Sequence, residues 1–247
     1  MKEMALTDHL TELRNRVIKI VIILFVAFGI CYHFGAEIQE ILLMPLINAL
    51  NGDGKVVFLG LLDKVLAQFQ LAFWSAIILS SPFWFTQLWL FIKPGLYEKE
   101  VKIIRPFLFI SFVLFWLGVL FGYFIVFPFT FTTILQFGVQ GIEATLSLKE
   151  YIVLASKVLV FLGLLFQLPN ILLILGFMGL VDSKKLSDIR SYVLTGFAIL
   201  SGILTPPDPI TLLALWIPLV ILYEIGILAV RLIAEPFKKS KDLSVMD

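Results

Sequence analysis

Six long apolar runs divide this chain, and they constrain its fold more than any other feature. They lie at 17–34, 69–92, 107–131, 151–180, 192–204 and 210–230. A helix of about 20 apolar residues crosses a bilayer core, and only helices or closed barrels satisfy their backbone hydrogen bonds inside lipid. The mean hydropathy of +1.01 lies far above that of a soluble domain. The sequence therefore predicts an all-α integral membrane protein with six transmembrane helices, forming a single transmembrane domain over residues 1–247.

The distribution of basic residues predicts the orientation of these helices. Fifteen of the 19 Lys and Arg residues fall in the amino-terminal segment, the loops after the second and fourth runs, and the carboxyl-terminal tail. Cytoplasmic loops of membrane proteins carry an excess of Lys and Arg. We therefore expect both termini in the cytoplasm (N-in, C-in), with residues 231–247 as a cytoplasmic tail.

The first run could also belong to a cleaved signal peptide, because basic residues precede an apolar core. The run continues, however, without a small-x-small cleavage site, so we expect it to be retained as the first span. Residues 5–17 place apolar side chains on one helical face. This pattern predicts an interfacial helix, resting on the lipid headgroups, that leads into the span.

Four prolines predict breaks in the helices. Pro82, Pro128 and Pro169 lie inside the second, third and fourth runs, where each should bend its helix. Such bends favour helices that curve around a concave surface. A short external helix over 36–44 is expected to stop at Pro45.

The fifth run is too short for an ordinary span. Residues 192–204 would make a helix about 20 Å long, whereas the bilayer core is about 30 Å thick. The run ends at the segment Thr-Pro-Pro-Asp-Pro, 205–209, which cannot continue a helix. We expect the fifth and sixth helices to form a hairpin whose turn lies below the outer lipid surface, in a locally thinned membrane.

The composition argues against an enzyme. Cys31 is the single cysteine and His9 and His33 are the only histidines, so neither an internal disulfide nor a two-histidine zinc motif can form. The sequence contains no G-x-S-x-G motif and no nucleotide-binding loop. We expect no catalytic residues, no metal and no cofactor.

Carboxylates are conspicuous on the basic cytoplasmic face, chiefly Glu12, Glu98 and Glu100. One interpretation is that each is a solvated charge or a helical i,i+4 partner, such as Glu12 with Arg16. The alternative is that two separate segments build a surface that binds a cation. Spacing alone does not separate Glu98 from Glu100.

Several motifs together resemble one family. H-L-T-E-L-R-N-R at 9–16, S-P with Q-L-W at 81–89, F-I-K-P-G-L-Y-E-K-E at 91–100, F-G-Y-F-I-V-F-P at 121–128, L-T-P-P-D at 204–208 and Y-E-I-G at 223–226 occur in order. They are similar to motifs of TatC, the multi-span receptor of the twin-arginine translocation system. The resemblance implies six helices bent into a cup, with short fifth and sixth helices, in the bacterial inner membrane.

The resemblance also implies a function and partners. Members of this family bind the Arg-Arg pair in signal peptides of folded proteins and export these proteins with TatA- and TatB-type single-span subunits, driven by the protonmotive force. We therefore expect contacts with such peptides, with those subunits and with membrane lipids, no contact with nucleic acid, and an oligomeric state within the complex.

The resemblance assigns roles to particular residues. Glu12 and Glu100 would receive the two arginines, Phe91 and Leu96 would shape the loop around them, and Arg14 and Arg16 would fix the adjacent helix. The outer cap, the outer hairpin and the inner end of the last helix would depend respectively on Pro45, Asp208 and Glu224.

Gln167 departs from the family pattern, because many relatives carry glutamate at this position. It is expected either to contact a partner helix or to form a hydrogen bond inside its own bundle.

A small secondary transporter is the alternative function. Such proteins tend to have paired repeats and charged residues near the middle of the membrane. This chain has no recognisable repeat, and the charged residues of its spans, Lys157 and Glu224, lie nearer the ends. The receptor hypothesis is therefore favoured.

Overall fold

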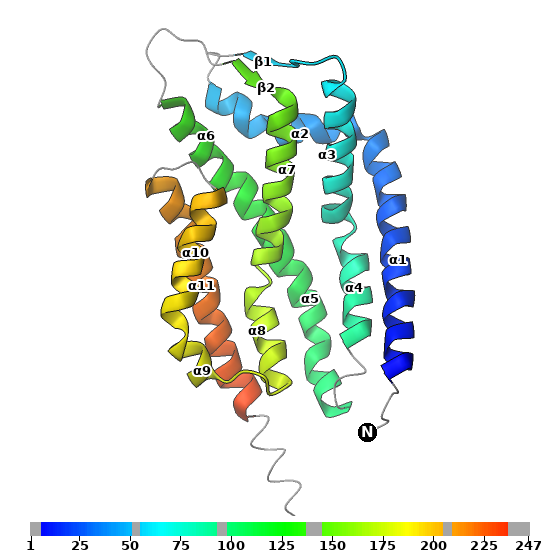
Figure 1. Cartoon of the computed structure of the whole chain (residues 1–247), viewed down its shortest axis with the longest axis vertical. Coiled ribbons are helices and arrows are strands. Elements are labelled where there is room, and N and C mark those ends of the chain that lie inside the picture. The colour runs from blue at the N-terminus through cyan, green and yellow to red at the C-terminus, as the bar shows by residue number, and fades with distance from the viewer. Residues whose placement is uncertain (1–5, 51–54, 93–97, 137–144, 205–208, 237–247) are drawn as a thin grey trace, which may run out of the picture.

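The computed structural model describes residues 6–50, 55–92, 98–136, 145–204 and 209–236, and most of them are helical. The long helices run side by side, with α1 and the α3–α4 pair along one side and α10 and α11 along the other (Figure 1). Among the described residues, the buried core lies where α3 and α5 pack against α7 and where α11 packs against α8. Its largest fully buried side chains include Phe115, Leu162 and Leu219.

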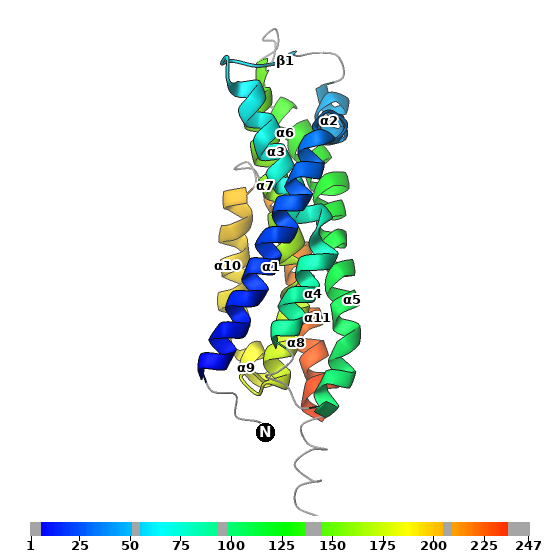
Figure 2. The ribbon, with the colours of Figure 1, turned by 90° about the vertical axis from the view of Figure 1, so that its right-hand side faces the viewer.

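Helix α1 spans Leu6–His33 without a break (Figure 2). The helix predicted over 5–17 is present from Leu6 onward and continues without a break into the first span. Its contact with the lipid headgroups stays a prediction. Neither proline nor glycine occurs between Leu6 and Val17, and each added residue of an existing helix gains a backbone hydrogen bond. Cys31 of α1 packs against Ala72 and Ala76 of α3, where small side chains let the two helices approach closely.

The second run is broken as its proline predicts. Helices α3 (Asp63–Leu79) and α4 (Ser81–Ile92) meet at Ser80 with a bend of 57°. Pro82 lies in the first turn of α4, where a missing N–H leaves no intrahelical bond unmade. The Ser80 hydroxyl donates a hydrogen bond to the carbonyl oxygen of Ala76 at 2.6 Å. This bond satisfies the hydroxyl, which is buried in the interior of the protein.

The third and fourth runs respond to their prolines in different ways. Helix α5 (Glu98–Phe121) passes through a π-helical turn, η2 (Gly122–Val126), into α6 (Phe127–Gln136). Pro128 therefore follows a widened turn and not a sharp bend. The fourth run divides into α7 (Leu148–Leu165) and α8 (Leu168–Phe177), with Pro169 in the first turn of α8. The predicted interruption at Pro169 is confirmed.

The last third of the chain consists of α9 (Ser183–Asp188), α10 (Arg190–Leu204), α11 (Pro209–Ala229) and the π-helical turn η3 (Val230–Ala234). Helices α10 and α11 lie side by side. Within the described residues, four stretches are long and apolar enough to span a bilayer, and the bent α3–α4 pair would be a fifth. Helix α10 is apolar but shorter. The six-span count and the orientation stay predictions.

The upper end of the molecule in Figure 1 combines a helix that the sequence predicted with a strand pair that it did not reveal. Helix α2 (Gly35–Leu50) crosses the helix axes there and continues through Pro45, so the predicted stop at Pro45 is wrong. Strands β1 (Lys55–Val57) and β2 (Thr145–Ser147) pair in parallel.

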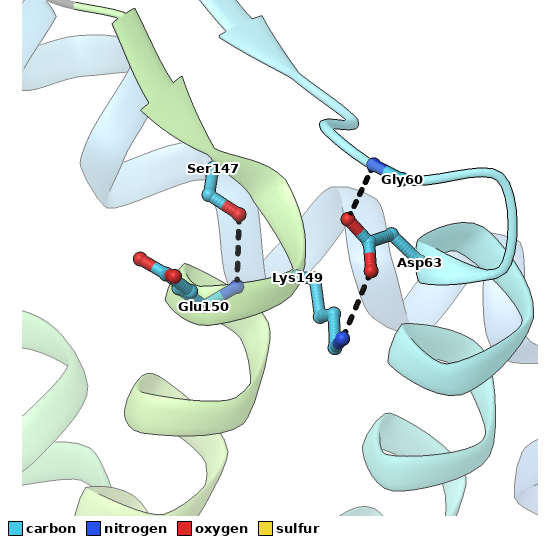
Figure 3. A network of polar contacts seen from close by, with 5 residues as sticks. All are labelled: Gly60, Asp63, Ser147, Lys149 and Glu150. Carbon is cyan, nitrogen blue, oxygen red and sulfur yellow. Dashed lines mark hydrogen bonds and ion pairs between the residues drawn. The ribbon is translucent and has the colours of Figure 1, made fainter.

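A polar network reinforces this end of the molecule (Figure 3). Asp63, the first residue of α3, accepts the backbone N–H of Gly60 at 2.7 Å and the Lys149 ammonium of α7 at 2.8 Å. The hydroxyl of Ser147 accepts the N–H of Glu150 at 3.4 Å and caps α7. The strand pair and the ion pair together tie the start of α3 to the start of α7.

Gly118 of α5 provides a test of the helix packing. A Cβ atom at this position would lie 2.6 Å from the carbonyl oxygen of Leu162 and 2.9 Å from Cα of Gly163. Both are backbone atoms of α7, so they cannot move aside. Gly118→Ala should lower the free energy of unfolding by about 1–3 kcal/mol, measured by denaturation in detergent. Gly29→Ala, where a Cβ meets open space, serves as the control, and equal effects of the two variants would contradict the packing.

Candidate functional site

The amino-terminal half of α1 carries the first candidate cluster. The Arg16 guanidinium donates one hydrogen bond to the Glu12 carboxylate at 3.3 Å and another to the side-chain carbonyl of Gln87 in α4 at 3.2 Å. The Glu12 and Arg16 side chains are 23% and 22% exposed. Arg16 therefore ties α1 to α4 and at the same time forms the i,i+4 pair with Glu12 that the spacing predicted. The Arg14 side chain is exposed.

The remaining residues expected at this site lie on neighbouring elements. The amino ends of α1 and α5 and the carboxyl end of α4 lie at the same end of the molecule (Figures 1 and 2). Glu100 belongs to the first turn of α5, but its side chain, like all of Leu96, lies outside the described residues. Phe91 is half-buried near the end of α4. The fold thus brings the elements that carry Glu12 and Glu100 to one end.

Glu224 has a partner that spacing could not reveal. Its carboxylate accepts a hydrogen bond from Nη2 of Arg190 at 2.9 Å, and its other oxygen forms an ion-pair contact with Nε of Arg190, also at 2.9 Å. Such a bidentate pair is strong and directional. Arg190 begins α10 and Glu224 lies in α11, so the pair joins the two helices. The hydroxyl of Tyr223 adds a hydrogen bond to the carbonyl oxygen of Leu186 at 2.8 Å.

Gln167 lies in a buried polar network. It is 6% exposed, and its amide nitrogen donates to the carbonyl oxygen of Ser111 in α5 at 2.7 Å. The Ser111 hydroxyl accepts hydrogen bonds from Asn170 and, at 3.4 Å, from the indole of Trp89 in α4. The predicted hydrogen bond inside the bundle is confirmed. Contact of Gln167 with a partner helix stays a prediction.

Two of the cavities beside α2, toward the opposite end from Glu12, have Tyr123 in their lining. An apolar groove of about 400 Å³ runs between α2, α3, α5 and α7, and Ser156, whose Oγ has no hydrogen-bond partner among the described residues, lines it. A smaller cavity of about 290 Å³ is lined by Pro45 and Pro128, and Tyr123 borders both cavities. Asp208 lies outside the described residues. In the described part of the chain, no three His, Cys, Asp or Glu residues gather as a metal site would need.

The arrangement of helices and motifs can now be compared with known proteins. A family model described as "Sec-independent protein translocase protein (TatC)" matches residues 8–218. The chain belongs to the TatC family. Its match includes the Glu12 cluster, the α4–α5 region and the first half of α11, so it is not confined to a single motif.

Curated relatives that are named as TatC match this chain over most of their length. The TatC of Magnetococcus marinus is 40% identical over 222 residues, which are 90% of this chain and 82% of the relative. The TatC of Desulforapulum autotrophicum is 39% identical over 236 residues, 96% of this chain and 86% of the relative. These relatives are named as translocase proteins, which are components of transport machinery and not enzymes.

Solved structures show the same fold. Two crystal structures of the twin-arginine translocase receptor TatC, one of them in DDM, superpose on this chain with TM-scores of 0.79 and 0.82. Each is 31% identical, and they cover 90% and 91% of this chain. The mainly helical architecture described above is therefore that of TatC proteins.

Ser111 provides a test of the buried network. Ser111→Ala removes the acceptor of the Trp89 indole and of the Asn170 amide, and an unsatisfied buried donor costs about 1–3 kcal/mol. We expect a loss of that size in unfolding free energy, measured in detergent. Thr195→Val, which removes an exposed hydroxyl bonded to its own helix, should change the stability little. A neutral Ser111→Ala variant would contradict the importance of the network.

Proposed function

We propose that this chain is the receptor subunit of a twin-arginine translocase. It binds the Arg-Arg pair in signal peptides of folded proteins and mediates their export together with TatA- and TatB-type single-span subunits, powered by the protonmotive force. Membership of the TatC family over residues 8–218 carries this proposal. Two similar solved structures, both of the twin-arginine translocase receptor TatC, support it.

Glu12 and Glu100 are the proposed acceptors of the two arginines. A guanidinium group presents a planar fork to two carboxylate oxygens, which an ammonium group cannot do. Hydrogen bonds to charged groups contribute about 1.5–3 kcal/mol each. Two engaged arginines can therefore supply several kcal/mol and select arginine over lysine.

The contacts of Arg16 would allow an arginine of the peptide to replace Arg16 as the partner of Glu12. The carboxylate of Glu12 already accepts a hydrogen bond from the guanidinium group of Arg16, and both side chains are partly exposed. Arg16 has a second partner, because its other terminal nitrogen donates to Gln87. Arg16 can keep its bond to Gln87 while the carboxylate of Glu12 turns to an arginine of the peptide. Phe91 and Leu96 would border the loop beside them.

We further propose the topology and location that this function requires. The chain crosses the bacterial inner membrane six times, with both termini in the cytoplasm and with oligomers forming within the complex. Four apolar stretches, the bent α3–α4 pair and the shorter helix α10 together provide six candidate spans. The distribution of basic residues supports the cytoplasmic position of both termini. Helix α10, with 15 residues, is about 22 Å long. The hairpin that contains Asp208 would then lie in a thinned part of the membrane, where it serves transport and not peptide recognition.

A peptide-binding assay tests the receptor hypothesis directly. The full chain in detergent or nanodiscs should bind an Arg-Arg signal peptide at least about tenfold more tightly than its Lys-Lys version, because losing one charged hydrogen bond costs about 1.5–3 kcal/mol. Glu12→Ala and Glu100→Ala should each weaken Arg-Arg binding by a similar factor. The affinity is measured by fluorescence anisotropy of a labelled peptide.

Matched variants control this assay. Glu98→Ala removes a carboxylate two residues from Glu100, and Glu150→Ala removes one from the amino-terminal turn of α7. Both variants, like Asp208→Ala, should bind the peptide normally. Equal affinity for the Arg-Arg and Lys-Lys peptides would remove the receptor hypothesis. Loss of binding in Glu98→Ala alone would move the site to that residue.

A further inference from the structure

Pro45 leaves a gap in the hydrogen bonding of helix α2. Proline has no backbone N–H, so the carbonyl oxygen of Ile41, four residues earlier, has no i+4 donor within its own helix. The proline ring also pushes that carbonyl outward, because it clashes with it in a regular helix. Where water is scarce, an unsatisfied backbone carbonyl is costly. Helix α2 nevertheless continues through Pro45 to Leu50.

A tyrosine from another part of the chain supplies a donor to this carbonyl. The hydroxyl of Tyr123 donates to the carbonyl oxygen of Ile41 at 2.6 Å, near the short end of the range for O–H···O bonds. Tyr123 lies 82 residues further along the chain, in the π-helical turn η2. The bond therefore joins α2 to the junction of α5 and α6.

The π-helical turn sets the position of Tyr123. Such turns insert an extra residue into a helix and are frequent at functional sites. Gly122, the residue before Tyr123, packs so closely on α7 that a Cβ atom would lie 2.7 Å from a methyl group of Leu162. The backbone at Tyr123 is thus held against α7, while its side chain borders both cavities beside α2.

Tyr151 makes a similar bond to the next carbonyl and allows a comparison. Its hydroxyl donates to the carbonyl oxygen of Leu42 at 2.6 Å. Residue 46, four positions after Leu42, is a leucine with a backbone N–H, so proline removes no donor from this carbonyl. Both tyrosines contact α2, but only Tyr123 bonds to the carbonyl that Pro45 leaves without its helical donor.

We propose that the hydroxyl of Tyr123 replaces the missing amide of Pro45 and so positions α2 beside the groove between α3, α5 and α7. Tyr123 is a positioning residue of this end of the molecule. The effects of Pro45 and Tyr123 on stability should be coupled, because the proline removes the helical donor of the Ile41 carbonyl and the hydroxyl supplies another. The link to transport rests on the proposed function, whereas the coupling of the two residues does not.

A double-mutant cycle on the full-length protein in detergent tests this coupling. Tyr123→Phe should lower the unfolding midpoint by about 2–4 °C in the Pro45 background, because the Ile41 carbonyl loses its donor. With Pro45→Ala, a backbone N–H returns to that carbonyl, and adding Tyr123→Phe should then lower the midpoint by less than about 1 °C. Pro45→Ser restores the same N–H and provides a second background if the alanine variant does not accumulate.

Tyr151→Phe is the matched control. It also removes a hydroxyl bonded to a carbonyl of α2, but its effect should be the same with proline or alanine at position 45. An equal loss from Tyr123→Phe in all backgrounds would overturn the proposal. So would a dependence of Tyr151→Phe on residue 45 as large as that of Tyr123→Phe.

A transport assay connects the coupling to function. Tyr123→Phe should slow the export of a folded cargo about fivefold, the effect of losing one ordinary hydrogen bond, while Arg-Arg peptide affinity stays unchanged. Pro45→Ala should remove the further effect of Tyr123→Phe on export. Normal export by Tyr123→Phe would overturn the positioning role in transport. Absence of any Arg-Arg preference would instead contradict the receptor proposal. The coupling of Pro45 and Tyr123 would then be judged by the double-mutant cycle on unfolding midpoints alone.

Discussion

The need to satisfy every backbone hydrogen bond inside lipid governs this fold. A proline inside a helix removes one backbone donor, and at four positions the chain responds to that loss in different ways. Pro82 and Pro169 lie in the first turn of a new helix, where the donor is not needed. Pro128 follows a π-helical turn. Pro45 remains inside its helix, and Tyr123 supplies the donor from elsewhere. The bends and this cross-link follow from the same constraint.

The sequence predicted the features of the fold that depend on local rules. Apolar runs located the long helices, and the breaks near Pro82 and Pro169 follow from proline chemistry. The continuation of α2 through Pro45 was missed, because it involves Tyr123, which is distant in the chain. The pairing of residues 55–57 with 145–147 was missed for a similar reason, since three-residue strands are too short to show alternation.

In the candidate site, too, contacts within one helix could be predicted from the sequence, whereas contacts between distant residues could not. The pairing of Glu12 with Arg16 follows from i,i+4 spacing, whereas Gln87, 71 residues away, could not be linked to Arg16 from the sequence. The pairing of Glu224 with Arg190 could not be predicted from the sequence either. Assignment of Glu12 and Glu100 to one function came from the family motifs. The fold adds that α1 and α5, which carry them, begin at the same end of the molecule.

Photo-cross-linking tests most directly whether two distant carboxylates serve one pair of arginines. A signal peptide with a photoreactive residue beside its Arg-Arg pair is bound to the full-length protein, and the cross-linked segments are identified by mass spectrometry. The account predicts cross-links both to α1 near Glu12 and to the start of α5 near Glu100, each displaced by excess unlabelled Arg-Arg peptide and not by its Lys-Lys version. Cross-links to only one of these segments, or equal displacement by both peptides, would contradict it.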